Sequence, residues 1–134
     1  MLKKTIEFTD YNGETRKEDF YFNLSKAELM EMELGTSGGF AEMLQRLVDT
    51  QDVPEIMKVF KQVVMKAYGV KSPDGKRFIK SEEQSKEFTE TEAYSELFME
   101  LLTDPDAAAA FINGIIPAEA AKQLENQNHP ALQR

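Results

Sequence analysis

The sequence predicts an α+β fold, mostly α, in which an N-terminal β-hairpin packs on a bundle of four to six short helices. Two observations lead to this prediction. β-Prone segments flank an Asn-Gly pair near the start, and apolar residues over 25–117 recur at helical spacing between capping and helix-breaking residues. Because 134 residues is close to the usual size of one domain, we expect one globular domain over 1–117 and a partly helical to disordered tail over 118–134.

The hairpin is expected over residues 3–23, with strands at 4–8 and 19–23. A two-residue Asn-Gly turn would place the apolar side chains of the two strands on opposite faces of the hairpin. A three-residue loop over 11–13, with Gly13 in the left-handed conformation, brings those side chains to one face. We therefore predict the three-residue loop.

The helical part begins at Ser25, which forms a capping box with Glu28. Gly35 ends this first helix, and a second helix follows it. A third helix begins with Pro54 in its first turn and closes at Gly69. The apolar stripes of the second and third helices are Phe40, Met43, Leu44, Leu47 and Val48, and Ile56, Val59, Phe60, Val63, Val64 and Ala67.

A Pro-Asp-Gly turn is expected within "KSPDGKRFIKS" (71–81). Phe78 and Ile79 after it form either a short edge strand or two plugs in the core. Ser81 then begins the next helical stretch, because two glutamates follow it and favour a helix N-terminus. The apolar stripe of this part is Tyr94, Leu97, Phe98, Leu101 and Leu102.

The last helix is expected to start at Asp104-Pro105, to run through Ile112 and to be broken by Gly114 and Pro117. Together the periodic segments predict a core of Phe20, Phe22, Phe40, Leu44, Leu47, Ile56, Phe60, Val63, Leu97, Phe98 and Leu101.

The composition argues against catalysis, metal binding and nucleic-acid binding. The chain has no cysteine, and its one histidine, His129, lies in the polar tail without a partner at catalytic or metal spacing. A net charge of −8 opposes binding to nucleic acid, whose phosphates select a basic face. The start lacks a secretory signal, and no apolar run approaches the ~18 residues of a membrane span. We expect a soluble intracellular protein that is not an enzyme, without cofactor, metal site, nucleic-acid or membrane partner.

Two charged segments have alternative interpretations. Glu92, Glu96 and Glu100 follow i,i+4 spacing, which suits a carboxylate metal site or, as we prefer, a solvated acidic stripe. The basic loop over 71–80 could contact nucleic acid through Phe78 between its cations. We prefer a turn with salt bridges to the acidic face over 82–100.

Two features favour binding of a partner. Seven methionines are many for this length, and methionine is common on adaptable binding surfaces as well as in irregular cores. The segment "AAAAFINGII" is apolar nearly all round, so it is either buried or offered to a partner. At its helix end, at least one of Ile115 and Ile116 is expected to escape full burial. The candidate partner-binding residues are Phe111, Ile112, Ile115, Ile116, Met30 and Met32.

Three stretches resemble one known family. "DFYFNLSKAELMEMEL" (19–34), "KSPDGKRFIKS" (71–81) and "TEAYSELFMELLTDPDAAAAFINGIIP" (91–117) are similar to the tail assembly chaperones of long-tailed bacteriophages of Gram-positive hosts. With the hairpin, the likeness covers about residues 3–117 and leaves out the tail. It is a whole-domain similarity without a catalytic motif.

The resemblance implies a non-enzymatic protein of virion assembly in the host cytoplasm. Such chaperones bind the aggregation-prone tape measure protein, keep it soluble, recruit the major tail protein that builds the tube, and are not retained in the virion. The alternative function is a minor structural tail component that stays in the particle. Self-association and a longer product made by ribosomal frameshifting are left open.

Overall fold

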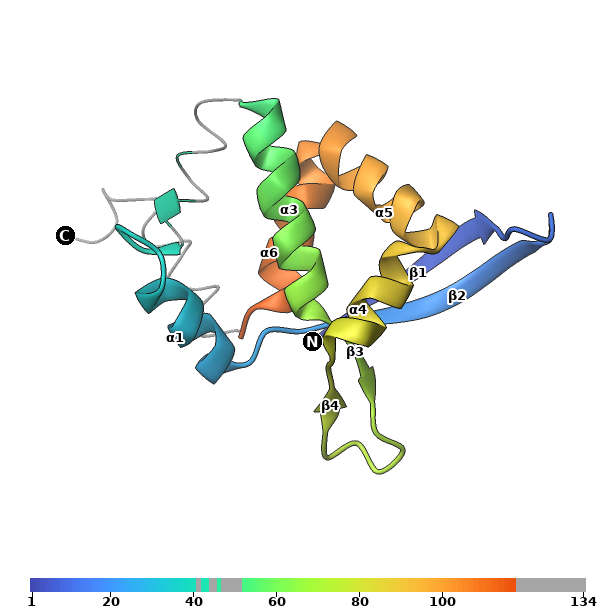
Figure 1. The fold of residues 1–134 in the computed structure, drawn as a ribbon, viewed down its shortest axis with the longest axis horizontal. Coiled ribbons are helices and arrows are strands. Elements are labelled where there is room, and N and C mark those ends of the chain that lie inside the picture. Colours follow the sequence, from blue (N-terminus) through green and yellow to red (C-terminus); the bar gives the residue numbers. More distant parts are fainter. Residues whose placement is uncertain (41, 44–45, 47–51, 118–134) are drawn as a thin grey trace.

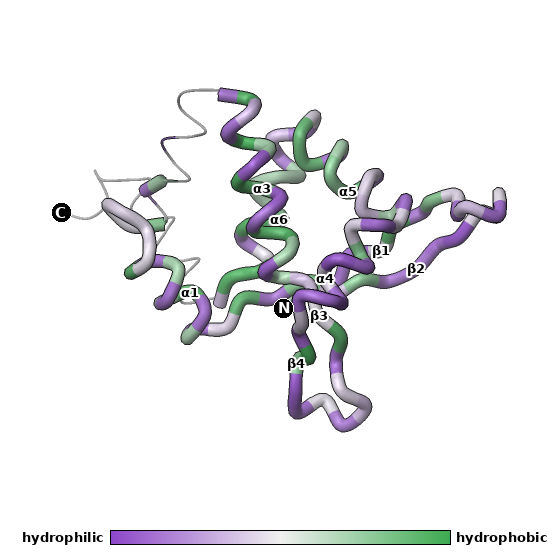
Figure 2. The backbone as a smooth tube through the Cα atoms, viewed as in Figure 1, coloured by the Kyte–Doolittle hydropathy of each residue, from purple (hydrophilic) through white to green (hydrophobic). Residues whose placement is uncertain are grey.

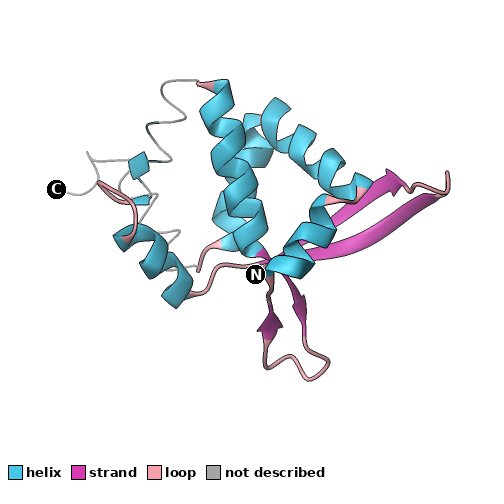
Figure 3. Ribbon diagram, viewed as in Figure 1, coloured by secondary structure: helices cyan, strands magenta, loops and turns pink. Residues whose placement is uncertain are grey.

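The computed structural model describes residues 1–40, 42–43, 46 and 52–117, and it confirms the α+β class (Figures 1 and 3). Four antiparallel strands form one sheet in the order β1-β2-β3-β4, and five helices with described bounds accompany it. The elements are β1 (Leu2–Thr9), β2 (Thr15–Phe22), α1 (Lys26–Leu34), α3 (Val53–Ala67), β3 (Tyr68–Lys71), β4 (Phe78–Ile79), α4 (Glu82–Thr89), α5 (Glu92–Thr103) and α6 (Pro105–Ile115).

The N-terminal hairpin has the predicted loop. Strand β1 pairs with β2 from Leu2↔Phe22 to Thr9↔Thr15. The N–H of Asp10 then donates to the Glu14 carbonyl at 2.8 Å, which leaves residues 11–13 at the tip. Gly13 has φ 81°, and its N–H donates to the Asp10 carbonyl at 3.0 Å. This register sets the apolar residues of both strands on one face, as predicted, although both strands are longer than expected.

The predicted helix starts are also confirmed. In α1 the Ser25 hydroxyl accepts a hydrogen bond from the N–H of Glu28, while the Glu28 carboxylate accepts one from the N–H of Ser25. Side-chain oxygens of Asp52, Ser81 and Asp104 likewise accept hydrogen bonds from backbone N–H groups at the starts of α3, α4 and α6. The stretch after residue 81 consists of two helices, because Thr91 caps a new one.

The second predicted helix falls largely outside the described residues. Phe40, Glu42, Met43 and Arg46 are helical, as expected there. The stripe residues Leu44, Leu47 and Val48 lie outside the described part of the chain.

Gly69 does not close α3, as the sequence suggested. The helix ends at Ala67, and Gly69 lies in β3, where it pairs with Tyr21 of β2. A Cβ at Gly69 would lie 2.7 Å from the ring of Phe78, so the glycine allows β4 to approach. Phe78 and Ile79 form the short edge strand, which was one of the two predicted alternatives.

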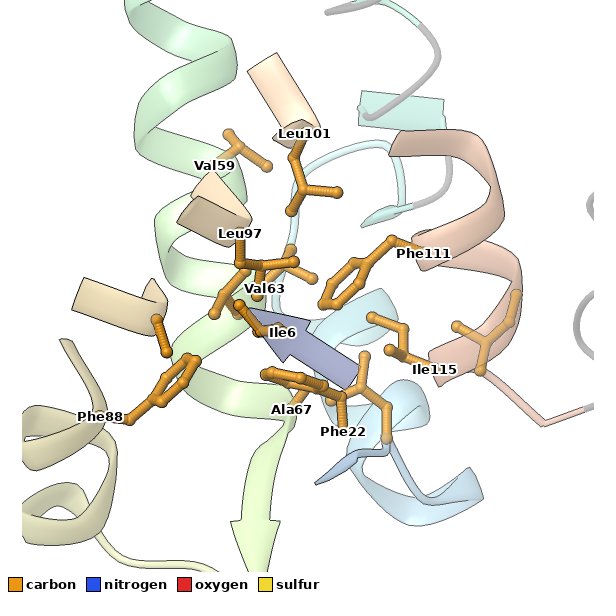
Figure 4. Packing of buried hydrophobic residues seen from close by; sticks show 14 of the residues in the cluster. Ile6, Phe22, Val59, Val63, Ala67, Phe88, Leu97, Leu101, Phe111 and Ile115 are labelled. Carbon is orange, nitrogen blue, oxygen red and sulfur yellow. The ribbon is translucent and has the colours of Figure 1, made fainter. Parts of the chain in front are cut away.

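The core lies between the sheet and the helices α3, α4, α5 and α6 (Figure 4). Aromatic rings fill its centre: Phe22 packs edge-on against Phe88 and Phe111, with ring centroids 5.7 and 5.3 Å away. The buried apolar residues from Ile6 to Ile116 form one cluster. The boundary predicted at residue 117 stays a prediction, because residues 118–134 are outside the described part.

Most of the predicted core that can be assessed is buried. Phe22, Phe40, Val63, Leu97 and Leu101 are buried, and Phe20 packs on the cluster while partly exposed. Leu44 and Leu47 are not described.

The prediction is wrong for Ile56, Phe60 and Phe98, which are only half-buried. The first two lie in the N-terminal half of α3, which extends away from the sheet (Figure 1). Phe98 stacks on Tyr94 along the side of α5, at 5.6 Å between ring centroids.

Candidate partner-binding surface

The apolar end of α6 belongs to the core. Phe111 and Ile115 are 2 % and 1 % exposed and point towards Phe22 (Figure 4), and Ile116 is 6 % exposed. Ile112 is partly buried and packs on the same cluster. The prediction that Ile115 or Ile116 escapes burial is therefore wrong, and the surface they were expected to offer is covered within the chain.

Contacts from distant parts of the sequence explain this burial. The N–H of Leu24 donates to the carbonyl of Ile115 at 2.7 Å, which joins the end of α6 to the chain that follows β2. Gly114 continues the helix instead of breaking it. A Cβ there would lie 2.9 Å from the end of the Leu2 side chain, so the glycine lets Leu2 pack closely on α6. Helix α6 thus extends to Ile115, three residues further than predicted.

Helix α1 has the opposite environment. None of its residues is buried, and it lies beside the main body of the fold in Figure 1. Leu29 and Met32 are partly buried and pack on the core. Met30 is 60 % exposed and Leu34 is 80 % exposed.

The exposed apolar residues of α1 share one face. Ala27, Met30 and Leu34 are all exposed and follow one another at spacings of three and four, which places them in a row along the helix. We call this row the α1 stripe. In Figure 2 apolar and polar residues alternate along α1, which explains why its overall amphipathicity is weak.

The sequence identified this helix only in part. Of the two candidate methionines, Met30 is exposed, whereas Met32 is partly buried and packs on the core. Partner binding by either stays a prediction. Leu34 was missed, although its i,i+4 spacing from Met30 was the available signal.

An ion pair connects the start of α1 to the chain just after β4. The Lys80 ammonium, just after β4, donates to the carbonyl of Asn23 at 2.6 Å and to both carboxylate oxygens of Glu28 at 2.8 and 2.7 Å. Partial burial raises the pKa of Glu28, but the hydrogen bonds from Lys80 and Ser25 outweigh it, so the net pKa is lowered. Glu28 therefore stays ionised at neutral pH and completes both the cap and the ion pair.

This ion pair corrects a prediction about the basic loop. Its cations were expected to bridge to the acidic face over 82–100, yet Lys80 pairs with Glu28 in α1. The physical reason is sheet geometry: strand β4 lies at the sheet edge and carries Lys80 towards the chain that enters α1.

The acidic row on α5 faces the hairpin in two places. Glu100 accepts a hydrogen bond from the Lys4 ammonium of β1 at 2.6 Å. Interaction with the Glu92 side chain raises the pKa of the Tyr11 hydroxyl at the hairpin tip. Glu96 is exposed. The row is thus partly a contact between α5 and β1 and not a fully solvated stripe.

Within the described residues, no three His, Cys, Asp or Glu side chains gather in a way that could hold a metal ion. His129 lies outside those residues. Among the described helices none has the length and apolar character that crossing a membrane requires.

The fold and the α1 stripe define a small α+β domain with an exposed apolar helix face, a kind of surface through which proteins bind helical partners. The chain belongs to the phage tail assembly chaperone family, whose model matches residues 1–134. The match includes the tail, which the resemblance in the sequence did not. No curated protein and no solved structure matches the chain.

Proposed function

We propose that this chaperone is non-enzymatic, binds the tape measure protein in the host cytoplasm, keeps it soluble, recruits the tail tube subunits and leaves before the virion is complete. Membership of the family supports a role in tail assembly. The observation that carries the proposal is the α1 stripe, with Met30 and Leu34 exposed on a helix that contributes no buried residue.

The stripe suits an amphipathic helix as its partner. Apolar side chains at i and i+4 are the anchors by which one helix packs along another. The flexible thioether of Met30 can adapt to successive apolar segments of a long helical client. The net charge of −8 would keep a client coated by many copies dispersed.

Co-expression with the tape measure protein of the same phage tests the proposal. Met30→Asp introduces a charge on the stripe, and we expect it to abolish co-purification of the client, because a charge in a desolvated apolar contact is strongly unfavourable. Met99→Asp on α5 is the matched control, since Met99 is 55 % exposed and lies on another helix. Circular dichroism should show both variants folded.

Equal recovery of the tape measure protein by the two variants would contradict the assignment of the stripe. If the wild-type chain recovers no tape measure protein, the proposal that this protein is the client is contradicted. Mass spectrometry of purified virions tests the departure of the chaperone: stoichiometric retention would instead support a minor structural component of the tail.

A further inference from the structure

The cations at the two hairpin tips of this acidic protein differ in their ion pairing. At the β1–β2 tip, Arg16 lies within ion-pair distance of Asp10, Glu14 and Glu18. At the β3–β4 loop, Lys76 and Arg77 are exposed, and neither forms an ion pair with any described residue. Other exposed lysines, such as Lys58 and Lys61, also form no ion pair with a described residue. Lys76 and Arg77 differ from them in being adjacent in one hairpin loop of a chain that has 24 acidic side chains.

Internal hydrogen bonds hold the β3–β4 loop in one conformation. The Ser72 hydroxyl donates to the Asp74 carboxylate at 2.6 Å and accepts from the N–H of Arg77 at 3.0 Å. The N–H of Lys76 donates to the same carboxylate at 3.0 Å, and Gly75 has φ 74°, which completes the turn. The backbone that carries both free cations is therefore ordered before any partner arrives, which reduces the entropy lost on binding.

The other groups of the loop are already engaged. The ring of Phe78 lies against Gly69, and the Lys80 ammonium lies over it, 5.7 Å from its centroid. Lys80 is paired with Glu28, and Lys71 lies over the ring of Tyr21, 4.7 Å from its centroid. Binding of single-stranded nucleic acid depends on free aromatic faces beside a basic groove. This loop instead offers the ammonium of Lys76 and the guanidinium of Arg77, and the chain as a whole is acidic.

We propose that the β3–β4 loop is a preformed basic anchor that docks on an acidic surface of a second tail protein, through Lys76 and Arg77. The loop projects away from the main body and from α1 in Figure 1, so a partner bound here leaves the α1 stripe accessible. Paired opposite charges mainly accelerate association and select the partner, and salt weakens them. The identity of that partner as the tail tube subunit rests on the proposed function.

Pull-downs from cells that co-express the tape measure and major tail proteins test the anchor. The variant Lys76→Glu/Arg77→Glu should lower recovery of the major tail protein about tenfold or more, while recovery of the tape measure protein is unchanged. Lys58→Glu/Lys61→Glu on α3 is the control, because it makes the same change in charge at two exposed lysines. Recovery by the wild type should fall at about 0.5 M salt.

Equal recovery of the major tail protein by the two double variants would overturn the anchor and leave the proposed function standing. A wild type that recovers neither tail protein would contradict the proposed function and, with it, the partner assigned to the loop. A gel shift of duplex DNA by the wild type that only the loop variant loses would overturn the protein partner in favour of nucleic acid. Loss of self-association in the loop variant alone, seen by sedimentation, would assign the loop to a second copy instead.

Discussion

Helices α1 and α6 both carry apolar side chains, and the fold places them in opposite environments. Helix α6 packs against β1 and α5 and buries Phe111 and Ile115, whereas α1 buries none of its residues. The sequence of α6 is the more apolar, which is why the end of this helix was a candidate partner-binding surface. The comparison shows that the strongly apolar helix of this small domain, α6, is used to build the core. The helix of mixed composition, α1, is the one whose apolar side chains stay exposed for a partner.

The two helices also differ in how they are attached. The end of α6 is joined to Leu24 by a backbone hydrogen bond, and its glycine accommodates Leu2. Helix α1 is held at its first turn by Lys80 and along one side by Leu29 and Met32. Four substitutions test this difference, from the largest expected effect to the smallest.

Phe111→Ala should destabilise the protein by about 3–5 kcal/mol, because it empties a site between rings in the centre of the core. Urea denaturation followed by circular dichroism measures the loss. Met30→Ala serves as the control from α1. A loss below about 1 kcal/mol for Phe111→Ala would show that α6 is not part of the core.

Lys80→Met should cost about 1–3 kcal/mol, because it leaves the carboxylate of Glu28 without its cation and frees the start of α1. Hydrogen exchange should quicken in α1 and stay slow in α6. Equal quickening in both helices would contradict the separate attachment of α1.

The cost of Lys80→Met should also depend on pH. The pKa of Glu28 is lowered from 4.5 in the folded protein, so the stability from this carboxylate is complete above pH 4.5 and is lost as the pH falls through the folded-state value. The difference in stability between wild type and variant should therefore shrink below about pH 4.5. In a chain that already carries Glu28→Gln, which removes the titrating group, the cost of Lys80→Met should not depend on pH in this range.

Gly13→Ala should cost about 1 kcal/mol, since φ at this residue is +81° while no atom lies within 4 Å of the added methyl group. The loss arises at the hairpin, which packs on α5 and α6. Thermal denaturation should therefore reveal it, while recovery of the tape measure protein in the proposed pull-down stays unchanged. An unchanged melting temperature would contradict the turn.

Leu34→Ser should change stability by less than about 0.5 kcal/mol, because the side chain is 80 % exposed. It should nevertheless weaken recovery of the tape measure protein if the α1 stripe is the binding surface. A large loss of stability would show that Leu34 is covered in solution.

The sequence by itself determined the local features of this protein. Side-chain parity and Gly13 predicted the loop of the hairpin, and hydrogen-bonding residues such as Ser25, Ser81 and Asp104 predicted the helix starts. Each of these depends on residues within a few positions of one another, where backbone geometry and capping decide the outcome. The whole-domain resemblance likewise led to the family that the match to residues 1–134 shows.

Only the tertiary structure decided which apolar helix is buried and which cations are paired. The end of α6 bonds to Leu24 through the Ile115 carbonyl, and Leu2 packs on Gly114; both partners lie about ninety or more positions earlier in the chain. Lys80 forms its ion pair with Glu28, which lies 52 positions earlier in the chain. Periodicity shows that a segment has an apolar face, but burial and ion pairing depend on what lies opposite that face, which is known only when the elements are packed together.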